Sequence, residues 1–277
     1  MAYPYHIDTI IDTALNEDLG PGDITTSAII DSSHKGKAKL VAKEELILAG
    51  IGICSRVFSR LDPEIVFECT HQDGEVIRKG TDIGTVTGLM RGILSGERTA
   101  LNFLQHLSGI ATITRQYVEK TDPSMVRIID TRKTTPGLRI LEKYAVRMGG
   151  GFNHRFGLFD GILIKDNHIA AAGSIPEIVK TIRAAVPHTL KIEVEVENIK
   201  GVEEAIGAGA DAILLDNMPV KEMKEVVSIA RGRVLLEASG GITLETIEEI
   251  SKTGINLISV GAITHSARSV DISLEVI

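Results

Sequence analysis

Beyond residue 125 the sequence alternates short apolar segments with segments that carry apolar residues at helical spacing. The apolar segments, interpreted as strands, are 126–130, 161–165, 191–196, 211–216, 233–238 and 256–260. Helical patterns between them cover 175–186, 199–209, 219–230 and 244–254. Because each helix is just long enough to return the chain to the same edge of a sheet, the alternation predicts parallel strands joined by right-handed crossovers. An open or closed β/α barrel fits this pattern best.

The first hundred residues follow a different pattern, which predicts a separate α+β domain. One amphipathic helix is expected at 6–19, and strand-like runs follow at 37–50, 64–70 and 82–88. A long helix is expected at 95–121, where Asp122 and Pro123 end it.

The change of pattern suggests two domains. We expect an N-terminal α/β domain with sandwich-like strands at 1–105 and a β/α barrel domain at 106–265. The C-terminal tail, 266–277, is expected to pack back on the N-terminal domain.

Composition and charge restrict the partners. The 277 residues are 43% hydrophobic and 24% charged, with a net charge of −7, which argues against nucleic acid because phosphate backbones need a basic face. The first twenty residues lack the basic and apolar regions of a signal peptide, and no long apolar run occurs. We therefore expect a cytoplasmic protein with no membrane partner.

Positive charge is nevertheless concentrated in the first part of the barrel domain. The cations there are Arg132, Lys133, Arg139, Lys143, Arg147, Arg155 and Lys165. In an acidic chain this cluster indicates a small anionic ligand. Segment 138–149 is predicted as a helix on which Lys143 and Arg147 lie one turn apart, so these two are expected on its outer face. The glycines after it would leave a loop that carries His154 and Arg155.

Polar or glycine residues follow every predicted strand of the barrel domain. They are Asp130 to Lys133, Lys165 to His168, Glu195 to Asn198, Asp216 with Asn217, Ser239 to Gly241, and Gly261 with His265 and Ser266. Any one of these groups could simply cap a helix or turn the chain. Because the carboxyl ends of the strands form the active sites of β/α barrels, their recurrence at all six ends predicts a site there.

The predicted strand at 191–196 alternates apolar residues with carboxylates. One of its faces would carry Glu193, Glu195 and Glu197. If helices cover the apolar face, these glutamates point into the barrel, where charge requires a cation or a hydroxyl-rich ligand. An exposed edge strand with solvated glutamates is the alternative. Asp216, which ends the next strand, is a natural partner for Glu195 in holding ribose hydroxyls or Mg²⁺.

The last two strand ends are glycine turns that lead into helical patterns, in "EASGGIT" and "SVGAITHS". Backbone N–H groups in such turns, with a helix N-terminus behind them, bind phosphate monoesters in β/α barrels. The sequence therefore predicts a phosphate site at these two strand ends.

Several motifs occur in a fixed order over nearly the whole chain. They are "GERTALNFLQHLSGIAT", "DTRKTTPGLRILEKYAVRMGGGFNHRFGLFDGILIKDNH", "EVEVEN", "ILLDN", "EASGGI" and "VGAITHS". Together they resemble quinolinate phosphoribosyltransferase, the decarboxylating type II phosphoribosyltransferase family of NAD biosynthesis, also called nicotinate-nucleotide pyrophosphorylase. The resemblance implies an α/β N-terminal domain and an open β/α barrel of about six or seven parallel strands. It also implies a homodimer, or a higher oligomer, in which the N-terminal domain of one subunit covers the barrel mouth of the other.

The resemblance further implies roles for single residues. Contacts with the substrate carboxylates fall on Arg132, His154, Arg155 and Arg98 of the partner subunit. Pyrophosphate and ribose contacts, which include the expected catalytic residues, fall on Lys133, Lys165, Glu195 and Asp216. The 5′-phosphate site falls on Ser239, Gly240, Gly261 and His265. Mg²⁺ is the expected cofactor, held by Glu195 and Asp216 directly or through water, although Glu193 is an alternative to Glu195.

The expected reaction is the transfer of phosphoribosyl from phosphoribosyl pyrophosphate to quinolinate, with decarboxylation to nicotinate mononucleotide. Lys133, Lys165 or water would supply the proton that replaces CO₂. Three alternatives stay open at this stage: a phosphoribosyltransferase for another aromatic acid, a Schiff-base barrel lyase that uses Lys165, and a non-catalytic phosphosugar sensor.

Overall fold

The computed structural model describes residues 6–277, which form two compact units. The first unit runs to Ile113 and also includes Thr135–Gly150 and Ser266–Ile277. The second unit comprises Thr114–Thr134 and Gly151–His265. Within the described residues, no helix is both long and apolar enough to cross a membrane.

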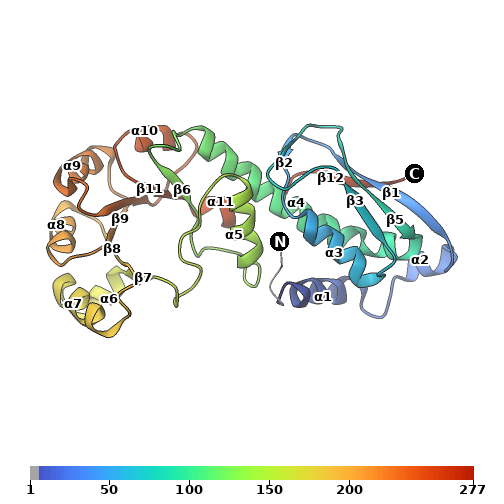
Figure 1. Ribbon diagram of the computed structural model, residues 1–277, viewed down its shortest axis with the longest axis horizontal. Coiled ribbons are helices and arrows are strands. Elements are labelled where there is room, and N and C mark those ends of the chain that lie inside the picture. The colour runs from blue at the N-terminus through green and yellow to red at the C-terminus, as the bar shows by residue number, and fades with distance from the viewer. Residues whose placement is uncertain (1–5) are drawn as a thin grey trace. The chain divides into compact units, whose positions relative to one another are not determined.

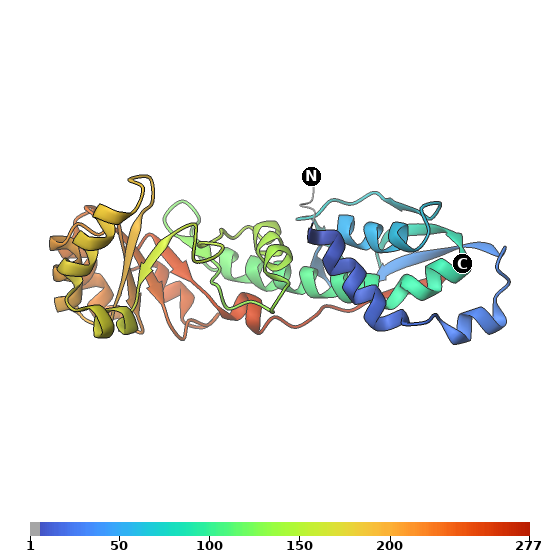
Figure 2. The same cartoon turned by 90° about the horizontal axis from the view of Figure 1, so that it is seen from below.

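The second unit contains a six-stranded parallel sheet in the order β6-β11-β10-β9-β8-β7. Its strands are β6 (Arg127–Ile129), β7 (Ile162–Ile164), β8 (Ile192–Val196), β9 (Ala212–Asp216), β10 (Leu235–Ser239) and β11 (Leu257–Ser259). The connecting helices are α6 (Asp166–Ala172), α7 (Ile175–Ala185), α8 (Ile199–Gly207), α9 (Val220–Ala230), α10 (Ile247–Ser251) and α11 (Ala262–His265). Helices α7, α8 and α9 lie in sequence along the outer side of the strands (Figures 1 and 2). The predicted β/α barrel is confirmed, with six strands.

The barrel is open between its two edge strands, β6 and β7. The chain between them passes beside the β6 edge, where Ile129 forms an isolated parallel bridge with Phe152. The N–H of Phe152 donates to the carbonyl oxygen of Ile128 at 2.8 Å. The segment 151–161 therefore enters the gap of the sheet and carries His154 and Arg155 with it.

The strand register determines which side chains face the interior of the barrel. Glu195 of β8 pairs with Leu214 of β9, and Leu214 pairs with Glu237 of β10, so the three lie in one row across the sheet. Asp216 and Ser239 are paired in the next row. Since successive strand residues point to opposite faces, these side chains share one face, while their apolar neighbours pack beneath the helices.

The first unit contains a four-stranded antiparallel sheet in the order β12-β1-β5-β3 (Figure 1). Its strands are β1 (Lys35–Ala42), β3 (Val66–Cys69), β5 (Asp82–Leu89) and β12 (Ile272–Val276), and a separate pair joins β2 (Leu46–Ile47) to β4 (Val76–Ile77). Its helices are α1 (His6–Leu19), α2 (Ile24–Ile29), α3 (Ile51–Leu61), the greater part of α4 (Met90–Glu119), and α5 (Arg139–Met148). The C-terminal strand β12 pairs with β1, so the tail is part of this sheet.

Helix α5 belongs to the first unit, although the expected division placed all of 106–265 in the barrel domain. Glu142 of α5 is fully buried, where its carboxylate contacts His106 Nε2 at 2.9 Å and accepts the Thr135 N–H at 3.2 Å. The expectation for the outer face of this helix holds for Arg147, which is exposed, and is wrong for Lys143, which is only 4% exposed. Helix α5 is covered around its middle and open to solvent at its C-terminal end. The spacing of two residues along the helix therefore does not determine whether each of them is exposed.

Candidate active site

A cavity of about 400 Å³ lies at the carboxyl ends of the strands in the second unit. Eight of the candidate site residues line it: Arg132, Lys133, His154, Arg155, Lys165, Glu195, Asp216 and Ser239. The other lining residues are Thr131, Leu163, Leu214, Glu237 and Ser259. The cations and carboxylates predicted from separate strand ends are thus brought to one place.

Lys165 and Glu195 form an ion pair on one side of the cavity. Lys165 directly precedes α6, and its Nζ lies 2.6 Å from Glu195 Oε2. The backbone N–H of Lys165 donates to His168 Nδ1 at 2.9 Å, which orients the start of α6. A Schiff-base nucleophile has to be an uncharged amine, so this ion pair disfavours the lyase alternative.

Asp216 lies at the end of β9, beside Ser239 of β10. Among the described residues its carboxylate makes no hydrogen bond and no ion pair. An acidic side chain at the cavity wall without a protein partner is suited to a cation or a sugar hydroxyl.

The glycine turns after β10 and β11 have the backbone geometry expected of an anion site. Gly240 has φ +93°, and a Cβ there would lie 2.2 Å from the side-chain oxygen of Asn217, so only glycine fits. A Cβ on Gly261 would lie 3.2 Å from the His265 ring and 3.3 Å from Lys133 Cδ. Gly261, His265 and Lys133 are therefore neighbours, although the two former do not line the cavity.

The expected helix N-terminus behind each glycine turn is present after Gly261, where α11 begins at Ala262, but does not directly follow Gly240 and Gly241. The helix after Gly240 and Gly241 begins only at Ile247, and α11 after Gly261 has four residues. The segment before α10 is instead a turn, in which the Thr243 N–H donates to Thr246 Oγ1 at 3.0 Å. Any anion here would be bound by N–H groups of the turns rather than by a long helix.

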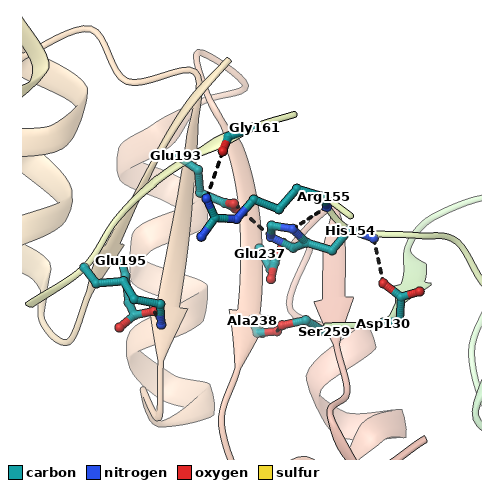
Figure 3. A network of polar contacts seen from close by, with 10 residues as sticks. Asp130, His154, Arg155, Gly161, Glu193, Glu195, Glu237, Ala238 and Ser259 are labelled. Atoms are coloured by element: carbon teal, nitrogen blue, oxygen red, sulfur yellow. Dashed lines mark hydrogen bonds and ion pairs between the residues drawn. The ribbon is translucent and has the colours of Figure 1, made fainter. Parts of the chain in front are cut away.

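The segment that fills the barrel gap is fixed by the buried carboxylate of Asp130. This carboxylate accepts the backbone N–H of His154 at 2.9 Å (Figure 3). It also accepts the side-chain amide of Asn153 at 2.5 Å. Arg155 Nη1 donates to the Gly161 carbonyl oxygen at 2.8 Å. Burial lowers the pKa of Arg155, and the charge of Arg132 adds to this effect. The charges of Arg132 and Arg155 thus repel one another, and an anion bound near both would offset this repulsion.

The tautomer of His154 follows from its contacts. The N–H of Arg155 donates to His154 Nδ1 at 2.6 Å, so Nδ1 is an acceptor and the proton is on Nε2. Nε2 lies 3.0 Å from Glu193 Oε2 and 3.8 Å from Glu237 Oε2 (Figure 3). His154 therefore donates into the barrel, to a carboxylate.

Glu237 was not among the residues singled out from the sequence. It is 1% exposed, and burial raises its pKa to about 8, with the nearby charge of Glu193 acting in the same direction. The sequence does contain a signal: Glu237 is the one acidic residue of the predicted strand 233–238, two positions before Ser239 and hence on the same face.

Arg98 lies on α4 in the first unit, and the residues that line the cavity all belong to the second. Its side chain is exposed and, within the described part of the chain, makes no hydrogen bond or ion pair. The pairing with Glu97 or a helix neighbour that a purely structural role would give is thus not formed there.

Family models match both parts of the chain. The quinolinate phosphoribosyl transferase N-terminal domain matches residues 23–108, and the C-terminal domain of the same family matches residues 110–275. The matches meet within α4.

Individual relatives agree with these matches. The probable nicotinate-nucleotide pyrophosphorylase (carboxylating) of Bacillus subtilis (strain 168) is 50% identical over 260 residues, which cover 94% of this chain and 90% of the relative. The quinolinate phosphoribosyltransferase (decarboxylating) 2b of Nicotiana tabacum is 40% identical over 295 residues, covering 99% and 84%. The crystal structure of NadC from Streptococcus pyogenes has a TM-score of 0.95 at 43% identity and covers 100% of this chain and 99% of that one. The chain therefore belongs to the quinolinate phosphoribosyltransferase family.

Proposed function

We propose that this chain transfers phosphoribosyl from phosphoribosyl pyrophosphate to quinolinate, with release of pyrophosphate and CO₂ and formation of nicotinate mononucleotide. The observation that carries the proposal is the convergence of Arg132, Lys133, Arg155 and Lys165 on one cavity of an acidic protein. Both substrates are polyanions, and a site that holds them together needs several cations. Membership of the family, whose relatives are named for this activity, supports the same conclusion.

Arg132, His154 and Arg155 are proposed to bind the two carboxylates of quinolinate. The planar guanidinium pairs with a carboxylate through two parallel hydrogen bonds, and this suits a rigid aromatic dicarboxylate. The same set disfavours nicotinate, which has one carboxylate and would leave one of these half-buried cations without a carboxylate.

Lys133, Lys165, Glu195 and Asp216 are proposed to act on phosphoribosyl pyrophosphate. The two lysines would neutralise the leaving pyrophosphate, and the two carboxylates would stabilise positive charge that develops on the sugar. Ser239, Gly240 and Gly261, with His265 near them, would bind the 5′-phosphate through the turns described above.

Mg²⁺ is proposed as the cofactor. The donors fit it, because carboxylate oxygens suit Mg²⁺ and the side chain of Asp216 has no partner among the described residues. Glu195, which is in contact with Lys165, would hold the ion through water. When bound, Mg²⁺ would neutralise part of the negative charge of the pyrophosphate.

The proposed chemistry proceeds in two stages. Pyrophosphate leaves C1′ through an oxocarbenium-like transition state, and the pyridine nitrogen forms the new bond to C1′. The ring nitrogen becomes cationic, so the adjacent carboxylate leaves as CO₂ and its electron pair stays on the ring carbon, where the cation stabilises it. A proton then takes its place. The protein contributes position and charge, and decarboxylation requires no further cofactor.

The direct test is a pyrophosphate-release assay with quinolinate, in which CO₂ is measured alongside. Equal amounts of the two products are expected, and nicotinate in place of quinolinate should give little of either. Faster turnover of nicotinate would instead identify a phosphoribosyltransferase for a different acid. Borohydride trapping of a substrate adduct on Lys165 would identify the lyase.

The assembly and location are proposals as well. We expect a homodimer in which Arg98 of the partner subunit completes each substrate pocket. The Arg98 side chain is exposed and has no partner within residues 6–277, which supports a role of this kind. We also expect the protein to act in the cytoplasm.

Replacement of either cavity carboxylate should lower turnover more than substrate affinity. Glu195→Gln and Asp216→Asn are each expected to reduce kcat by at least about tenfold, because the lost charge acts mainly in the transition state. The affinity of the protein alone for quinolinate, measured by calorimetry, should change by less than about twofold. The control is Glu197→Gln, an exposed glutamate just beyond β8. A selective loss of quinolinate affinity would show that these carboxylates bind quinolinate, and would contradict their assignment to phosphoribosyl pyrophosphate.

A further inference from the structure

The interior of the barrel holds a cluster of the half-buried His154 and the buried Glu193 and Glu237, of which His154 and Glu237 also line the cavity. One nitrogen or oxygen from each lies within 4.8 Å of the others. Glu193 is 8% exposed and Glu237 is 1% exposed, so water screens neither carboxyl group well. Two ionised carboxylates at this separation would repel each other strongly, and the cluster must contain a compensating positive charge.

A metal ion does not suit the contacts of this cluster. A metal on Nε2 of His154 would require the ring proton to move to Nδ1. That nitrogen already accepts the N–H of Arg155 at 2.6 Å, so a proton there would be directed at another proton. The hydrogen-bonded geometry is therefore compatible with a proton between the carboxyl groups rather than a metal ion.

The contacts also identify which carboxyl group carries the proton. Glu193 accepts the Nε2–H of His154 at 3.0 Å, so one of its oxygens already has a donor. Glu237 has a buried oxygen, Oε1, with no hydrogen-bond partner among the described residues. An ionised carboxylate with one unsatisfied buried oxygen is costly, whereas a neutral acid that contacts Glu193 is much less so.

We propose that Glu237 is a positioning residue: as a neutral acid it donates a hydrogen bond to Glu193, which accepts the Nε2–H of His154 and so fixes His154 and Arg155 for the substrate acid. Three residues, His154, Arg155 and Glu237, border both the active-site cavity and a smaller cavity of about 270 Å³ on the same face of the sheet. Glu237 thus lines the same two cavities as the pair that it positions. The inference rests on the proposed function in one respect: that function identifies quinolinate as the ligand that His154 and Arg155 bind.

Ionisation of Glu237 would add a second negative charge near this pair. The groups that face Glu237 are Glu193 from β8, His154 and Arg155 from the gap segment, and the hydroxyl of Ser259 from β11. The other charged residues that line the two cavities are Arg127, Arg132, Lys133, Lys165, Lys191, Glu195 and Asp216. A carboxylate at Glu237 would attract the His154 proton away from Glu193 and oppose the entry of a dicarboxylate.

The test compares the pH dependence of Glu237→Gln with that of the unchanged protein. Glutamine is uncharged, similar in shape to the protonated acid, and can donate to Glu193 through its amide. At pH 7 the variant should have a kcat/KM for quinolinate within about twofold of the unchanged protein. At pH 9, with a Glu237 pKa of about 8, roughly one molecule in ten keeps the proton, so the variant should be about tenfold more active than the unchanged protein.

The control is Glu197→Gln, which should follow the pH profile of the unchanged protein. Coincident profiles for Glu237→Gln and the unchanged protein would overturn the proposal.

A second measurement does not depend on activity. Because the pKa of Glu237 is raised on folding, the folded protein retains a proton that the unfolded chain releases, and stability falls as pH rises from about 5 to about 8. Removal of this group should make the melting temperature of Glu237→Gln exceed that of the unchanged protein by a margin that grows over this interval, to about 4 °C or more. If the margin grows while the activity profiles coincide, Glu237 holds a proton but does not position His154, and the proposal is wrong. If quinolinate is not a substrate, the thermal result still stands and only the proposed function fails.

Should Glu237→Gln fail to fold, Glu193→Gln provides the alternative. Loss of the neighbouring charge should let Glu237 ionise more easily, since that charge raises its pKa. The decline of activity at alkaline pH should then begin at lower pH than in the unchanged protein. A decline that stays in place or moves upward would contradict the assignment of the proton to Glu237.

Discussion

Arg155→Lys is expected to lower kcat/KM for quinolinate by about 100-fold or more. Arg155 Nη1 already donates to the Gly161 carbonyl oxygen at 2.8 Å. The rest of the guanidinium remains for a ligand, including the buried Nε, which has no hydrogen-bond partner among the described residues. A lysine has one point of charge and cannot fill both roles. Steady-state kinetics with each substrate varied in turn should show the loss for quinolinate, with the KM for phosphoribosyl pyrophosphate changed by less than about threefold.

A matched control is Arg147→Lys on α5, where the arginine is exposed and belongs to the first unit. That variant should retain normal kinetics, because its charge is kept at a solvated position. Near-normal kinetics for Arg155→Lys would remove Arg155 from the substrate site, and a loss confined to phosphoribosyl pyrophosphate would assign it to the other substrate.

The barrel was predictable because its strands and helices have different, strong periodicities. The alternation in 191–196 also predicted which face of β8 carries charge, and the burial of Glu193 rules out the alternative of an exposed edge strand. Parallel strands bring their carboxyl ends to one edge, so residues such as Lys165 and Asp216 could be placed together without knowledge of the strand order.

The cluster of His154, Glu193 and Glu237 was not predictable in the same way. Glu237 occurs in an otherwise mainly apolar strand, and its place in the same row as Glu195 depends on the register of β10 with β9 and of β9 with β8. His154 reaches the cluster because the segment 151–161 fills the gap between β6 and β7, and that segment has no periodicity from which to read its path. Tertiary contacts, which no local pattern encodes, determine both positions.

The prediction that both Lys143 and Arg147 of α5 are exposed was wrong for Lys143 for a related reason. Spacing correctly put Lys143 and Arg147 one turn apart, but the burial of Lys143 depends on what covers the middle of the helix. The expected domain division also placed this helix in the barrel domain, whereas it belongs to the first unit, so the sequence did not identify the residues that cover it. Periodicity identifies a face of a helix but not the element that covers it.

Two inactive variants are expected to regain activity when they are mixed. Arg98→Ala and Lys165→Ala should each have almost no activity, because one removes a contact proposed to reach the partner subunit's pocket and the other removes a cation of the cavity itself. A hybrid dimer of the two has one pocket that lacks both residues and one pocket that keeps both. With random exchange about half of the dimers are hybrids, and each has one intact site, so roughly a quarter of the normal activity should return.

The strength of this experiment is that an arginine that acts only within its own chain cannot produce the result. In that case every pocket of every dimer would lack either Arg98 or Lys165, and mixing would restore nothing. Exchange is verified with two differently tagged forms of the protein, and a mixture of Arg98→Ala with itself sets the background. If tagged subunits exchange and activity stays at that background, Arg98 does not complete the partner's site, and its exposed position on α4 requires a different explanation.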